Sequence, residues 1–77
     1  MGSLLDYLAA ATGLFLSDLR YNIYWKNLFH VVLAIDSSSF PLEEWNYAYS
    51  YIFHMEQAFS NSAAAKEAFL NRLHASF

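Results

Sequence analysis

Cysteine is absent from the sequence. Its absence excludes a disulfide framework, a thiolate nucleophile and a cysteine-ligated zinc site, and it fits a reducing compartment such as the cytoplasm. Proline occurs once and glycine twice, so residues that break helices are scarce and helices are favoured. The 77 residues have the length of one small domain, and we expect a single helical domain over residues 1–77.

Positive charge is also scarce, because four Lys and Arg stand against seven Asp and Glu, for a formal net charge of −3. Four cations cannot follow a phosphate backbone, so we do not expect nucleic acid as a ligand. The interval between Lys26 and Lys66 holds no cation and is acidic; its carboxylates are Asp36, Glu43, Glu44 and Glu56. Such a stretch serves either solubility or attraction to a basic partner.

Apolar runs long enough to cross a membrane are missing too. The longest near the centre, residues 28–35, is far below the ~20 residues that span a bilayer. The first residues include no basic region, and Asp6 interrupts their apolar stretch, so we expect neither a signal peptide nor a membrane partner.

Apolar residues are plentiful. Hydrophobic residues make up 57%, aromatic residues 19% and charged residues 14%, whereas typical chains are about 45–50% apolar and about 25% charged. A domain of this size buries only about 60% of the surface of its unfolded chain. We therefore expect part of the apolar excess to face a partner protein or a second copy of this chain.

Turn signals and apolar spacing predict four helical segments, over residues 3–12, 18–35, 41–59 and 63–75. Ser3, Ser17 and Ser62 suit N-caps, Gly13 suits a left-handed stop, and Pro41 suits a first turn. The second segment is apolar on nearly all sides, which is typical of a central helix. One apolar stripe runs along the last segment, through Ala65, Phe69, Leu73 and Phe77.

The breaks between these segments are short, and short connections favour antiparallel neighbours. The predicted fold class is all-α, a compact antiparallel bundle of about four helices, or of three if the first two fuse.

The third segment is the most informative about function. One side carries a core stripe of Leu42, Trp45, Tyr49, Ile52 and Phe59, and the other carries Glu43, Glu44, Tyr47, Tyr51 and His54. Tyr47, Tyr51 and His54 are spaced to form one continuous strip, and this face combines acidic and aromatic side chains without Lys or Arg. Tyrosine offers rigid contact area and carboxylates pair with Lys or Arg, so we predict that these five residues bind a partner. The alternative is that the tyrosines pack under another helix and the glutamates only stabilise the start of this one.

No constellation for catalysis is evident. His30, His54 and His74 lie in three different segments, and none has a metal-binding companion one helical turn away. Glu43 and Glu44 are adjacent on a helix, so their carboxylates diverge, and neither a nucleophile motif nor a glycine-rich phosphate loop occurs. We expect no enzymatic activity, no cofactor and no metal.

These traits together suit a stoichiometric protein inhibitor, most concretely a bacterial immunity protein or antitoxin that occludes a basic toxin or enzyme. Glu43 and Glu44 would pair with cations of the partner, and Tyr47 and Tyr51 would fill its apolar pockets. Two alternatives stay open. One is a homodimeric adaptor, secretion chaperone or regulatory subunit, and the other is a binder of small apolar ligands in an aromatic cavity.

Overall fold

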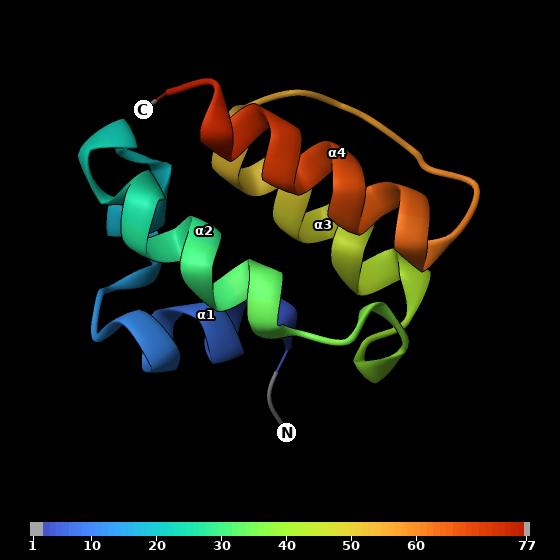
Figure 1. The fold of residues 1–77 in the computed structure, drawn as a ribbon, viewed down its shortest axis with the longest axis horizontal. Coiled ribbons are helices and arrows are strands. Elements are labelled where there is room, and N and C mark those ends of the chain that lie inside the picture. Colours follow the sequence, from blue (N-terminus) through green and yellow to red (C-terminus); the bar gives the residue numbers. More distant parts are fainter. Residues whose placement is uncertain (1–2, 77) are drawn as a thin grey trace.

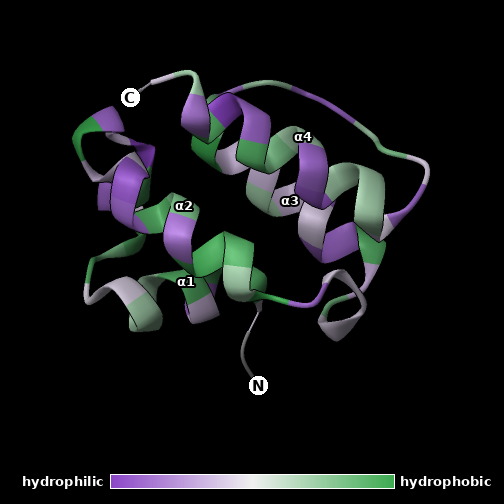
Figure 2. Cartoon of the chain, in the orientation of Figure 1, coloured by the Kyte–Doolittle hydropathy of each residue, from purple (hydrophilic) through white to green (hydrophobic). Residues whose placement is uncertain are grey.

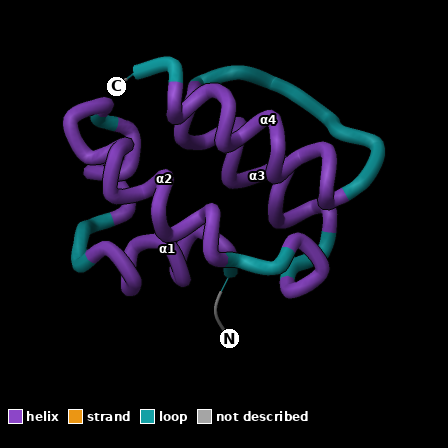
Figure 3. Tube along the Cα trace, viewed as in Figure 1, coloured by secondary structure: helices purple, strands orange, loops and turns teal. Residues whose placement is uncertain are grey.

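The computed structural model describes residues 3–76. They form four α-helices, α1 (Leu4–Thr12), α2 (Trp25–Ala34), α3 (Leu42–Phe53) and α4 (Ser62–His74), and three short 3₁₀ helices, η1 (Leu16–Arg20), η2 (Asn22–Tyr24) and η3 (Ser37–Ser39) (Figure 1, Figure 3). No strand occurs within this range. The predicted all-α bundle of about four helices is confirmed.

The helices pack in pairs around one core. α2 contacts both α1 and α4, and α3 contacts the same two helices. α2 runs opposite to α1 and to α4, as short connections favour, but α3 and α4 run side by side in the same direction (Figure 1). Their corresponding ends meet: Ser62 Oγ donates to the Phe40 carbonyl at 3.5 Å, and Arg72 Nε donates to the Tyr49 hydroxyl at 2.9 Å. Residues 54–61 therefore return along the length of the pair.

α1 begins and ends where the sequence predicts. Ser3 Oγ accepts from the Asp6 N–H at 3.1 Å, and the Asp6 carboxylate accepts from the Ser3 N–H at 3.3 Å, which forms a capping box. Gly13 has φ 73° and donates its N–H to the Ala9 carbonyl. This left-handed conformation costs glycine little, so α1 stops there.

The predicted helix over residues 18–35 is wrong in its first third, because α2 begins only at Trp25. Ser17 caps nothing; the Asp18 carboxylate instead accepts from the Phe15 N–H at 3.2 Å. Trp25 Nε1 donates to the Leu19 carbonyl at 2.9 Å, an oxygen that a regular α-helix would pair with the N–H four residues later. Residues 16–24 therefore form two 3₁₀ turns, joined at Tyr21 in an extended conformation.

The third and fourth segments also need a correction at their boundary. α3 ends at Phe53 rather than at residue 59, because His54 adopts φ 57°, a left-handed conformation that ends helices. Phe59 returns to the core from the connection, where its N–H donates to Asn46 Oδ1 at 3.0 Å. Asn61, not Ser62, caps α4, and its Oδ1 accepts from the Ala64 N–H at 2.8 Å.

The predicted core stripes of α3 and α4 lie inside. Trp45, Tyr49 and Ile52 are buried, Leu42 and Phe59 are half-buried, and the described part of the α4 stripe is fully buried at Ala65, Phe69 and Leu73. Phe77, the last residue predicted for that stripe, lies outside the described residues. α4 accordingly alternates between hydrophilic and hydrophobic residues along its length (Figure 2).

The polar atoms of this core are paired. Trp45 Nε1 donates to the Ser37 carbonyl at 3.0 Å, and no buried side-chain nitrogen or oxygen within residues 3–76 lacks a hydrogen-bond partner. Over the same residues, no helix has the length and apolar character needed to cross a membrane.

Candidate functional site

The predicted partner-binding residues lie on one helix and its cap. Glu43, Glu44, Tyr47 and Tyr51 are on α3, and His54 follows its last residue. Glu43 and His54 are exposed, and Tyr47 is 61% exposed, whereas Glu44 and Tyr51 are half-buried. Glu43 and Tyr47 therefore form the outermost part of the predicted surface.

Glu44 has a structural partner in the chain itself. Its Oε1 accepts from the Leu4 N–H at 2.8 Å, across 40 positions of sequence. A carboxylate at this point satisfies one of the unpaired N–H groups of the first turn of α1. Glu44 thus ties α3 to α1, a long-range contact that the sequence pattern does not reveal.

Tyr51 and His54 both contact a cation from a distant segment. The Arg20 guanidinium lies 5.1 Å from the centre of the Tyr51 ring. Arg20 Nε and Nη2 lie 2.9 and 2.7 Å from Nε2 and Nδ1 of His54. A neutral imidazole offers one acceptor nitrogen, so one of these two contacts is the hydrogen bond and Arg20 is its donor. No Lys or Arg lies near Tyr51 and His54 in the sequence, so the cation beside them comes from η1.

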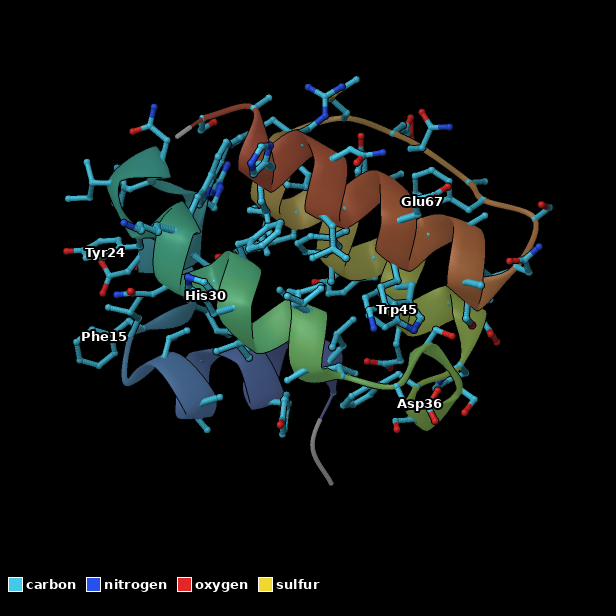
Figure 4. The ribbon with its side chains drawn as sticks, in the orientation of Figure 1. Phe15, Tyr24, His30, Asp36, Trp45 and Glu67 are labelled. Atoms are coloured by element: carbon cyan, nitrogen blue, oxygen red, sulfur yellow. The ribbon has the colours of Figure 1, made fainter. Side chains whose placement is uncertain are left out.

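Four of the exposed hydrophobic side chains lie close together in the sequence, on η1, η2 and the residues that flank them. They are Phe15, Leu16, Tyr21 and Ile23, which are 80%, 39%, 60% and 76% exposed, and we call them the η1–η2 surface. The only other large hydrophobic side chains exposed within residues 3–76 are Tyr7, Leu33, Tyr47 and Met55. Phe15 points outward at the end of the molecule where Tyr24 also lies, and Asp36 and Glu67 lie toward the opposite end (Figure 4).

The sequence pattern did not predict the η1–η2 surface, because we expected residues 18–35 to form one continuous central helix that is apolar on nearly all sides. The spacing of the residues gives no signal of it, because Phe15, Leu19 and Ile23 are four residues apart, as on one face of an α-helix. Leu19 is fully buried, yet Phe15 and Ile23 are 80% and 76% exposed, because the backbone of residues 16–24 forms two 3₁₀ turns.

Most cations of the chain bond within the fold. Lys66 Nζ donates to the Leu33 carbonyl at 3.2 Å and to the Ile35 carbonyl at the end of α2. Arg72 donates to the Tyr49 hydroxyl and lies 5.7 Å from the Phe53 ring. Together with Arg20, this leaves Lys26 as the exposed cation for which no such contact is seen in the described residues.

Carboxylates divide into caps and exposed groups. Asp6, Asp18, Asp36 and Glu44 each accept a backbone N–H at the start of a helix. Hydrogen bonds from the backbone and hydroxyl of Ser38, helped by nearby Lys66, hold the pKa of Asp36 below its ordinary value of 3.8. Glu43, Glu56 and Glu67 are exposed.

The remaining candidate sites are a surface depression and groups of metal-ligating side chains. An open depression is lined by Tyr49, Ala68, Asn71, Arg72 and Ala75. Within residues 3–76, no three His, Asp or Glu side chains lie close enough to hold a metal ion.

No protein-family model, curated protein or solved structure matches this chain.

Proposed function

We propose that this chain is a non-catalytic protein-binding protein that neutralises a basic partner by occlusion, in the manner of an immunity protein or antitoxin. The observation that carries the proposal is the pairing of an exposed carboxylate, Glu43, with an exposed aromatic ring one helical turn away, Tyr47. A rigid aromatic side chain beside a free carboxylate suits recognition of a surface that combines cations with apolar pockets.

The contacts that each of the five predicted residues makes within the fold suggest a different role in binding for each. Glu43 is the carboxylate best placed to meet Lys or Arg, because the Glu44 carboxylate already accepts the Leu4 N–H. Tyr47 supplies the apolar anchor. Tyr51 and His54, held by Arg20, supply the edge of the surface, where Arg20 favours an acidic or polar group of the partner.

Net charge supports the same proposal. The chain carries a formal charge of −3, and a net charge opposite to that of the partner accelerates encounter. Salt screens such attraction, so binding by this mechanism weakens as ionic strength rises.

The test is a pull-down from the lysate of the source cell with a pair of matched variants. The first carries Glu43→Ala and Tyr47→Ala, and the second carries Glu67→Ala and Tyr21→Ala. The pairs remove the same residue types and the same charge, and the two tyrosines are equally exposed, at 61% and 60%. We expect the wild type and the second variant to capture one stoichiometric basic protein, and the first to bind it at least about tenfold more weakly.

Two outcomes contradict the proposal. Loss of the partner with the Glu67 and Tyr21 variant alone moves the binding surface to another part of the molecule. Capture of an acidic partner, or binding that strengthens with salt, removes the charge mechanism.

The alternative of an aromatic ligand cavity has weaker support. Tyr49, Phe53, Phe59 and Phe69 are the rings that would line it, and they pack against one another with centroids 4.8–6.0 Å apart. The homodimeric alternative is favoured by a separate observation, the exposure of the η1–η2 surface.

A further inference from the structure

The η1–η2 surface is large for a chain of this size. Aromatic side chains bury about 150–250 Å² each when they are fully covered, so the four partly exposed side chains present on the order of 500 Å² of apolar area. The largest apolar patch of a typical monomer is about 300–600 Å² and is often functional, so an area of this size is a candidate interaction surface. Phe15 and Ile23 are 80% and 76% exposed, so neither is held in place by the core.

The area of the η1–η2 surface indicates what kind of molecule could cover it. Two copies that meet through these side chains would bury about 1,000 Å² in total, which is the lower limit for a specific protein interface. A two-fold arrangement reaches this value with the residues already exposed, because the same surface is used twice.

The charge of the segment that carries this surface also indicates what kind of molecule could cover it. The stretch from Phe15 to Lys26 contains Asp18, Arg20 and Lys26 and no other charged residue, so its formal charge is +1 although the chain carries −3. The Asp18 carboxylate and the Arg20 guanidinium are already hydrogen-bonded within the fold. Two copies can therefore approach through this end with little like-charge repulsion, whereas contact through the start of α3 would oppose Glu43 and Glu44 of both copies.

We propose that the η1–η2 surface binds a second copy of this chain and forms a two-fold dimer, with Phe15 and Ile23 as its main apolar contacts. Glu43 and Tyr47 are not among the residues proposed for the dimer contact, so this proposal does not depend on the proposed function. The interface is close to the lower limit of area for a specific contact, so we expect the dimer to form reversibly as the protein concentration rises.

Sedimentation velocity over a wide range of protein concentrations tests the proposal. Phe15→Ser and Ile23→Ser are the test variants, and Leu33→Ser is the matched control, because Leu33 is a similarly exposed aliphatic residue (53%) on α2. We expect the wild type and Leu33→Ser to convert from monomer to dimer as concentration rises. Each test variant should raise the dissociation constant by about tenfold or more.

Circular dichroism of every variant checks that the fold is retained, and Ile23→Asp provides a second disruption by charge. The Glu43→Ala, Tyr47→Ala variant should dimerise like the wild type, so the two proposals fail separately. A wild type that stays monomeric at every concentration overturns the dimer. A dimer that persists in both Phe15→Ser and Ile23→Ser also overturns the proposal. The same holds for growth into larger assemblies and for binding of the monomer to lipid vesicles through the same residues.

Discussion

Residues 15–24 and α4 are both rich in apolar side chains, yet they differ in what those side chains do. In α4, Ala65, Phe69 and Leu73 are spaced by four and are fully buried. In residues 15–24, Leu19 is fully buried while Phe15 and Ile23 are exposed. Each region has a polar cap at its start, Asn61 for α4 and Asp18 for η1.

The difference teaches that apolar spacing decides burial only where the backbone is a regular α-helix. In α4, side chains four residues apart share one face and can all meet the core. Phe15, Leu19 and Ile23 have the same four-residue spacing. The two 3₁₀ turns and the extended Tyr21 between them do not keep such positions on one face, so Leu19 is buried and the other two are exposed.

The largest expected effect compares two phenylalanines. Phe69→Ala, in α4, leaves a cavity at a fully buried site and should lower the free energy of unfolding by about 3–5 kcal/mol. Phe15→Ala, in the irregular region, removes a ring that is 80% exposed and should change it by no more than about 0.5 kcal/mol. Urea denaturation of both variants at one low protein concentration measures the pair, and equal losses would break the comparison.

The next effect compares two neighbouring glutamates of α3. Glu44→Ala leaves the Leu4 N–H of α1 without its acceptor and should lower the free energy of unfolding by about 1–2 kcal/mol. Glu43→Ala removes an exposed carboxylate and should stay within about 0.5 kcal/mol. Thermal unfolding distinguishes them, and a destabilised Glu43→Ala would assign a structural role to the residue proposed for binding.

The smallest effect concerns a 3₁₀ turn that the sequence pattern does not reveal. The pKa of Asp36 is lowered from 3.8 in the folded chain by its bonds to Ser38, so the folded state takes up a proton less readily than the unfolded state. The stabilisation is complete above the unfolded pKa and is lost as pH falls through the folded pKa. Wild type should be more stable than Asp36→Asn at neutral pH, and the gap should close below pH 3.8. Denaturation at a series of pH values measures the gap, and a gap that widens in acid contradicts the assignment.

Local signals explain how much of the fold could be predicted. Ser3 and Gly13 determine the ends of α1, and the four-residue spacing in α4 determines its buried face. The end of α3 could not be predicted, because the residues around His54 give no sign that His54 adopts a left-handed conformation. The helix over residues 18–24 was overpredicted, because the Trp25 bond to Leu19 depends on tertiary packing.

The candidate surface shows the same limit. The exposure of Glu43 and Tyr47 follows from the helical period of α3. The engagement of Glu44 by α1 and of Tyr51 by Arg20 does not, since each contact joins segments more than thirty positions apart. A helical wheel identifies which side chains face away from the core. It does not show which of those side chains contact another segment of the chain.

The parallel course of α3 and α4 has an electrostatic consequence. The peptide dipoles of two antiparallel helices oppose each other, whereas those of this pair add, and each helix start contributes about half a unit of positive charge. Glu43 and Glu44 lie in the first turn of α3, and Arg72 lies in the last turn of α4, so these charges have the sign that the backbone favours at each end. The backbone thus offsets part of the charge of Glu43 and Glu44. Reversing α3 would place these carboxylates at its negative end, and reversing α4 would place Arg72 at its positive end.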